Sequence, residues 1–108
     1  MSKARGVLEL GVPAESARAS SRRAFASMGW AVTGERAGVI EAREDPARLP
    51  CHHSPASASL RFTGDGGACS VTIETTVPGF GPVSASHARG RQGAIVRRLH
   101  AAANDPRT

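Results

Sequence analysis

The sequence predicts an α+β protein with the element order β-α-β-β-β-β-α, in which a single curved antiparallel sheet carries two helices packed on one face. Apolar and polar residues alternate in residues 6–12, 30–43 and 57–76, and glycine-rich turns divide the last two segments. Helical spacing replaces this alternation in residues 14–28 and 84–103. Strands of this kind with short connections favour antiparallel pairing.

The first strand runs directly into the first helix. Alternate positions of residues 6–12 are apolar, which predicts a strand with one buried face: Leu8, Leu10 and Val12. Pro13 fixes φ for the first helical turn, and Gly29 ends the helix after Met28. Small and apolar residues form the stripe that this helix buries against the sheet: Ala17, Ser21, Ala24, Phe25 and Met28.

A first hairpin is predicted from Trp30 onward, where the apolar period returns to two. Folding the chain about Arg36 places Trp30 opposite Ala42 and Val32 opposite Ile40. All four side chains then share one apolar face of the sheet, and Trp30 belongs to the core.

A second hairpin closes across the glycine-rich residues 64–67. Symmetric closure gives apolar pairs on one face: Phe62 with Cys69, Leu60 with Val71, and Ala58 with Ile73. The other face carries Arg61, Ser70 and Thr72. A slip of one residue would bury Arg61, so the predicted faces are strongly specified.

Two segments contain helix and strand breakers. Residues 44–56 hold three prolines and are predicted to form a long loop. Residues 77–82 form a second break, in which we expect Phe80 to fold back over the sheet, with an exposed contact residue as the alternative. Ser84 or Ser86 then caps a last helix that reaches Ala103 and buries one stripe: Ala88, Ile95, Leu99 and Ala102.

The order strand, helix, four strands, helix resembles the TBP-like superfold of one half of the TATA-binding protein. With additional strands, START and Bet v 1-like helix-grip domains share this arrangement. The entry Leu10-Gly11-Val12-Pro13-Ala14-Glu15 is similar to the strand-to-helix turn of START-like domains. The resemblance covers most of the chain in its order of elements and these six residues in sequence. It implies a ligand or partner held between the sheet and the last helix.

The length and composition suit one domain, which we place at residues 1–103, with a C-terminal tail at 104–108. Apolar runs are all shorter than the roughly 18 residues that a membrane helix needs, so no membrane contact is expected. The chain has two cysteines, Cys51 and Cys69, and a core of this size folds without a disulfide framework. We therefore expect a cytoplasmic protein with unbridged thiols.

The leading hypothesis for function is a small non-enzymatic binding module. In it, the sheet and the helices hold a small apolar ligand or a protein partner, without cofactor or metal. Four large apolar residues are the candidate contacts: Trp30, Phe80, Ile95 and Leu99.

The alternative is an arginine-rich accessory protein that binds nucleic acid. The formal charge is +5, and 13 of the 14 basic residues are arginine. Both predicted helices carry candidate phosphate contacts: Arg18, Arg22, Arg23, Arg89, Arg97 and Arg98. These arginines have no interleaved aromatic residue for base stacking, so we expect weak, salt-sensitive binding.

A third hypothesis, a small enzyme, rests on Cys51-His52-His53. A cysteine beside a histidine is the minimum for an activated thiolate. Adjacent ligands rarely point to one ion, and no CxxC, HxxxH or HExxH spacing occurs in the chain, so no metal site is expected. We favour an exposed loop thiol beside two ordinary imidazoles.

Overall fold

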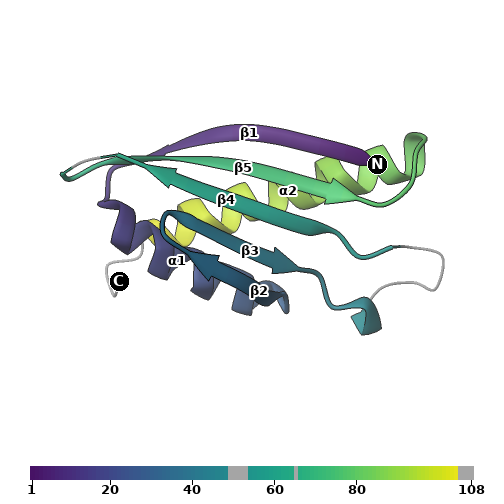
Figure 1. The fold of residues 1–108 in the computed structure, drawn as a ribbon, viewed down its shortest axis with the longest axis horizontal. Coiled ribbons are helices and arrows are strands. Elements are labelled where there is room, and N and C mark those ends of the chain that lie inside the picture. Colours follow the sequence, from purple (N-terminus) through teal and green to yellow (C-terminus); the bar gives the residue numbers. More distant parts are fainter. Residues whose placement is uncertain (49–53, 65, 105–108) are drawn as a thin grey trace.

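The computed structural model describes residues 1–48, 54–64 and 66–104 (Figure 1). The elements follow in the predicted order: β1 (Ser2–Leu10), α1 (Ala14–Met28), β2 (Ala31–Arg36), β3 (Val39–Arg43), the 3-10 turn η1 (Pro46–Arg48), β4 (Ser57–Thr63), β5 (Cys69–Val77) and α2 (Pro82–Ala103). Of the predicted C-terminal tail, only Asn104 lies within the described residues.

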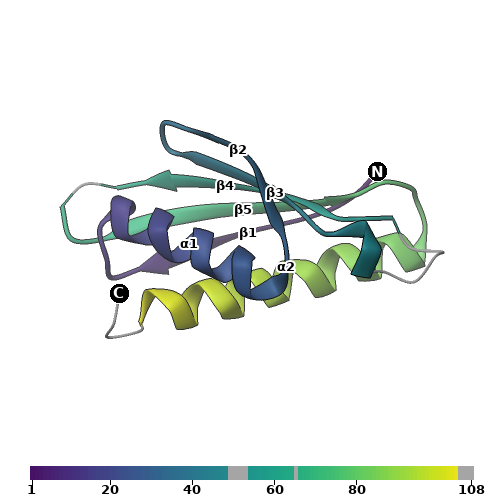
Figure 2. The ribbon, with the colours of Figure 1, turned by 90° about the horizontal axis from the view of Figure 1, so that it is seen from below.

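The strands form one antiparallel sheet with the order β1-β5-β4-β3-β2, so the first strand lies beside the last. Both helices cover the same face of this sheet (Figure 2), while the other face bears no helix. The sheet is visibly twisted along its length (Figure 1). The predicted α+β class and arrangement of layers are confirmed. Neither helix is both long and apolar enough to cross a membrane, within the part of the chain that the structure describes.

The ends of α1 follow from single residues. Pro13 precedes the helix with φ −61°, and Gly29 ends it with φ 77°, in the left-handed region that glycine tolerates. Strand β1 begins at Ser2 and ends at Leu10, earlier than predicted at both ends. The reason is the length of its partner, because β5 continues to Val77 and pairs that residue with Ser2.

The hairpin of β4 and β5 has the predicted faces but a register displaced by two residues. Leu60 lies opposite Ile73, and Phe62 lies opposite Val71. Ladder pairing begins at Thr63 with Ser70, so the connection is longer and less symmetric than expected. Because the side-chain period of a strand is two, this displacement leaves every residue on its predicted face.

The register predicted for the first hairpin is wrong. Val32 pairs with Ala42, and a bulge separates Val32 from Gly34. The turn is tighter than a fold about Arg36, since that residue already pairs with Val39 and Gly38 supplies the positive φ of 74°. The bulge absorbs the extra residue, and Val32 is 40% exposed instead of buried.

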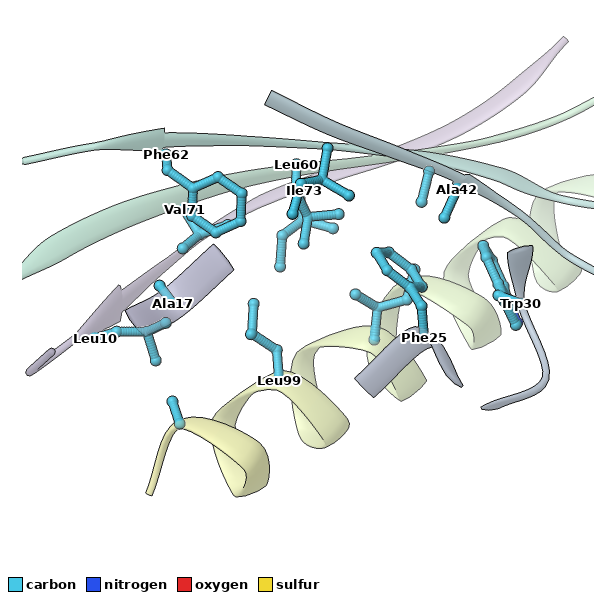
Figure 3. Packing of buried hydrophobic residues seen from close by; sticks show 14 of the residues in the cluster. Leu10, Ala17, Phe25, Trp30, Ala42, Leu60, Phe62, Val71, Ile73 and Leu99 are labelled. Atoms are coloured by element: carbon cyan, nitrogen blue, oxygen red, sulfur yellow. The ribbon is translucent and has the colours of Figure 1, made fainter. Parts of the chain in front are cut away.

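The core fills the space between the sheet and the helices. Phe25 and Leu99 project from the helices toward Leu60 and Ile73 of the sheet (Figure 3). The ring of Phe25 stacks on Trp30 with centroids 5.6 Å apart. These side chains are almost wholly buried, and the interior is therefore packed with the protein's own residues.

Helix α2 is fastened across β5 by a partly buried side-chain amide. Nε2 of Gln92 donates to the carbonyl oxygen of Ile73 at 2.9 Å, and Oγ1 of Thr75 donates to Oε1 of Gln92 at 2.5 Å. A Cβ at Gly6 would lie 3.3 Å from Nε2 of Gln92, so the absence of a side chain there permits this close approach. The middle of α2 is thus fixed over β1 and β5.

Candidate functional site

A buried carboxylate lies where the chain leaves β3. Glu44 is 6% exposed, and its backbone N–H donates to the carbonyl oxygen of Ala56 at 2.9 Å. The backbone N–H of Ala56 donates in return to Oε1 of Glu44 at 3.1 Å. These two bonds hold the carboxyl group at the end of the sheet that faces α2.

Two side chains of α2 converge on this carboxylate. Nε2 of His87 lies 2.9 Å from Oε1 of Glu44, and Nε of Arg91 lies 2.7 Å from Oε2. An ionised carboxylate only accepts hydrogen bonds, so Nε2 of His87 carries the hydrogen. The contact of Arg91 is an ion pair whose N–H is not aligned for a hydrogen bond. We call Glu44, His87 and Arg91 the Glu44 cluster.

Pockets lie on both sides of Arg91. The first, here called the α2 pocket, has a volume of about 490 Å³, and its lining among the described residues is one stripe of α2: Pro82, Val83, Ser86, His87, Gly90 and Arg91. The second, the Trp30 pocket, has a volume of about 250 Å³ and lies among α1, α2 and the start and end of the first hairpin: Met28, Trp30, Glu44, Asp45, Arg91, Ala94 and Arg98. Arg91 therefore lines both hollows.

The four candidate apolar contacts do not form one site. Trp30 lines the Trp30 pocket while remaining 6% exposed, but Ile95 and Leu99 are buried in the core at 1% and 0%. Phe80 is 87% exposed, so the expectation that it folds back over the sheet is wrong. Its neighbours Gly79 and Gly81 have φ of 100° and 102°, a conformation that turns the segment away from the sheet.

The predicted arginines divide among several places. Arg18 and Arg22 both bind Glu35 of β2, with Nη2 of Arg18 3.0 Å from Oε1. The hydrogen bond from Arg22, with a smaller contribution from Arg18, holds the pKa of Glu35 below its ordinary value. The same bond raises the pKa of Arg22. Two of the six arginines are thus engaged with a carboxylate.

Arg23 and Arg98 do lie together. They line a hollow of about 270 Å³ between the two helices, with Ala24, Ser27, Ala101 and Ala102. Nη1 of Arg98 donates to Oγ of Ser27 at 3.3 Å, which holds it near α1. Arg89 and Arg97 are exposed on α2. Of the six candidate phosphate contacts, Arg23 and Arg98 are thus the two that line one described hollow.

The structure does not test the hypothesis of a small enzyme built on Cys51-His52-His53. Cys51, His52 and His53 lie outside the described residues. Cys69 is a free, buried thiol, and its burial, together with the nearby Glu9 carboxylate, raises its pKa. No group of three histidine, cysteine or acidic residues is arranged to hold a metal in residues 1–48, 54–64 and 66–104.

Sequence reasoning missed the Glu44 cluster. The sequence places Glu44 in the predicted proline-containing loop and does not single out Arg91. A signal was present in α2. His87, Arg91, Ile95 and Leu99 follow one another at a spacing of four, so all four lie on one face of the helix. When the side chains on a buried helix face change from apolar to polar, the polar ones need hydrogen-bond partners on the element packed against them.

Comparison with solved structures identifies the fold. A protein from Nitrosospira multiformis superimposes with a TM-score of 0.60 at 10% identity, covering 92% of this chain and 94% of its own. Ara h 8.0201 gives 0.54 at 8% identity, covering 94% and 96%. The di-domain ARO/CYC StfQ of the steffimycin biosynthetic pathway gives 0.55 at 12% identity, covering 93% of this chain and 44% of StfQ.

These similarities show that the chain has a helix-grip fold of the Bet v 1-like and TBP-like kind, as its element order suggested. No protein-family model matches the sequence, and no curated protein matches it. At identities of 8 to 12%, the shared fold does not carry function from those proteins to this one. The function has to be argued from the site.

Proposed function

We propose that this protein is a non-enzymatic module that binds a small molecule in the α2 pocket, against Arg91. The observation that carries this proposal is the pairing of a pocket of about 490 Å³ with a cationic side chain fixed from behind by Glu44. Pockets of roughly 300 to 1,000 Å³ are typical of small-molecule sites, with a few polar groups that fix orientation.

The proposed position differs from the space between sheet and helices. Ile95 and Leu99 occupy that space and have no exposed surface to offer a ligand. The first turns of α2 instead expose apolar surface, with Val83 64% exposed. A ligand there would cover Val83 while its polar group meets Arg91.

A second candidate, acid–base catalysis, is favoured by one contact. His87 lines the α2 pocket and is oriented by the Glu44 carboxylate, as a catalytic imidazole is in many enzymes. The ARO/CYC StfQ shares the fold and takes part in a biosynthetic pathway. We place binding first because the same carboxylate also engages Ala56 and Arg91, which suits a structural clamp as well as a catalytic pair.

The test is a screen of small acids, amines and neutral compounds by amide proton–nitrogen NMR correlation spectra. We expect bound compounds to shift resonances of Ser86, His87 and Gly90. The variant Gly90→Leu fills the α2 pocket, while Ala101→Leu adds the same side chain at an exposed position in the last turns of the helix.

Shifts that disappear in Gly90→Leu and persist in Ala101→Leu support the site. Compounds that leave the α2 resonances unchanged, or that shift them equally in both variants, would reject it. Recovery of the bound compound unchanged after long incubation supports a binding module, whereas its conversion supports the catalytic candidate.

A further inference from the structure

We propose that the ligand of the α2 pocket is an organic acid whose carboxylate pairs with Arg91 and whose apolar part lies along Pro82 and Val83. This inference rests on the proposed function and adds the chemical class of the ligand. It comes from the charges of the lining, the way Arg91 is held, and the surface beside it.

The described lining of the α2 pocket contains no acidic residue. Its ionisable residues are His87 and Arg91, and Ser86 adds a hydroxyl. The Glu44 carboxylate lies behind them with 8% of its side chain exposed and belongs to the lining of the Trp30 pocket instead. A molecule in the α2 pocket therefore meets the guanidinium of Arg91 with no acidic side chain among the described lining residues, which favours an anionic group.

Arg91 is held in one orientation before any ligand arrives. Its Nε atom is buried against Glu44, yet the side chain as a whole is 39% exposed, so the exposed surface belongs to its other atoms. A guanidinium has five N–H donors in a planar fork that matches a carboxylate. Because the ion pair with Glu44 already restrains the Nε end of this side chain, less conformational freedom is lost when an acid binds.

Gly90 keeps the pocket open beside this guanidinium. A Cβ at Gly90 would meet no atom within 4 Å, so packing does not require glycine at this position. Glycine in the interior of a helix is nevertheless destabilising relative to alanine. The missing side chain leaves room next to Arg91, and the exposed Val83 supplies apolar surface about two turns earlier in the helix.

The Trp30 pocket does not carry the same inference. Arg91 and Arg98 line it together with Glu44 and Asp45, so its positive and negative groups are balanced. It offers no comparable preference for an anion over a neutral molecule.

The experiment compares octanoate, octanamide and octylamine, which share an eight-carbon chain and differ in the charge of the head group. Each compound is titrated into the full chain, and its Kd is read from the amide resonances of α2. We expect octanoate to bind at least about tenfold more tightly than octanamide, because a charge-assisted bond to Arg91 is stronger than a neutral one. Equal binding of octanoate and octanamide, or tighter binding of octylamine, would overturn the proposal.

Two variants separate charge from shape. Arg91→Gln should lower the affinity for octanoate to that of octanamide, and Gly90→Leu should remove binding of both. Ala101→Leu is the control and should bind octanoate as the unaltered protein does. Because Arg91→Gln disturbs the Glu44 cluster, its titration is done well below its measured Tm, and Gly90→Leu tests the site independently of that cluster.

The outcomes also separate this inference from the proposed function. In one outcome, neutral or cationic compounds bind in the α2 pocket, Gly90→Leu abolishes their binding, and octanoate does not bind. This outcome would reject the organic acid as ligand and retain the proposed binding module. Binding of no compound in this pocket would reject both.

Discussion

His87 donates from Nε2 to Oε1 of Glu44 across 2.9 Å, although the two residues are 43 positions apart in the chain. This bond fastens the second turn of α2 to the end of β3. Gln92 fastens the same helix to β5 further along. Polar contacts of His87 and Gln92 therefore attach the N-terminal half of α2 to the sheet. Apolar packing of Ile95 and Leu99 attaches its C-terminal half.

Replacing Glu44 should weaken the fold. Glu44→Ala removes the acceptor of the Ala56 N–H and of His87, and leaves Arg91 without its ion pair. We expect a loss of about 2 to 3 kcal/mol in the free energy of unfolding, measured with urea. Glu74→Ala is the control, because the exposed Glu74 lies 4.0 Å from Lys3 in a surface pair. Equal losses in the two variants would contradict a structural role for the cluster.

The centre of the sheet should be sensitive to truncation. Leu60 and Ile73 are both 0% exposed and lie opposite each other on β4 and β5. We expect Leu60→Ala or Ile73→Ala to cost roughly 2 to 4 kcal/mol in urea unfolding, because each leaves a cavity in a packed core. Arg61→Ala, on the outer face of β4, should change stability by less than about 0.5 kcal/mol.

The two hairpins show what alternation predicts and what it leaves open. In β4 and β5, every apolar residue predicted for the inner face is buried, because face depends only on the period of two. The pairing itself depends on the turn, and it differs from the prediction in both hairpins. At Gly38 the turn is tighter than expected, which shifts the pairing of the two strands. The bulge after Val32 then shifts the register again, and the local sequence pattern does not reveal it.

Cys69 should react slowly with thiol reagents in the folded protein. It is 3% exposed, and burial raises the pKa of its thiol, so little thiolate is present at neutral pH. The measurement is labelling of Cys51→Ser, in which Cys69 is the remaining cysteine, with and without urea. Labelling at the same rate in both conditions would show that the thiol is accessible in the fold.

Glu35 should make stability depend on pH in the acid range. The hydrogen bond from Arg22 holds the pKa of Glu35 below its ordinary value, so the folded state favours the ionised form. The resulting stabilisation is present above the unfolded pKa and is lost as pH falls through the folded pKa. The difference in Tm between the unaltered protein and Glu35→Gln should therefore shrink between about pH 6 and about pH 3. Glu41→Gln on β3 provides the matched control for a more exposed pair.

Nucleic-acid binding should be weak. Arg18 and Arg22 are engaged with Glu35, and the basic grouping reduces to Arg23 and Arg98. We expect a Kd for duplex or single-stranded DNA in the non-specific range of about 10⁻⁴ to 10⁻⁶ M, lost as salt rises. Submicromolar binding at physiological salt that disappears in Arg23→Ala/Arg98→Ala would instead establish a docking surface for phosphate.

The candidate site was only partly within reach of sequence reasoning. Trp30 was expected in the core and is there, but Glu44 stands in a segment without periodicity, where nothing distinguishes a buried acid from a solvated one. Its partners His87 and Arg91 are remote in sequence, so their meeting depends on how α2 lies across the sheet. The prediction for Phe80 is wrong because the two flanking glycines permit several chain directions, between which the sequence pattern does not decide.

The bulge in β2 has a consequence for the behaviour of the protein at high concentration. Strand β2 is one edge of the sheet, and a regular edge offers free N–H and C=O groups on which a second chain can add a strand. The displaced residue between Val32 and Gly34 interrupts that row of groups. The opposite edge, β1, carries the charged Lys3, Arg5 and Glu9 on the face without helices, so an incoming strand would have to accommodate three fixed charges. Both borders of the sheet thus resist fibril-like growth.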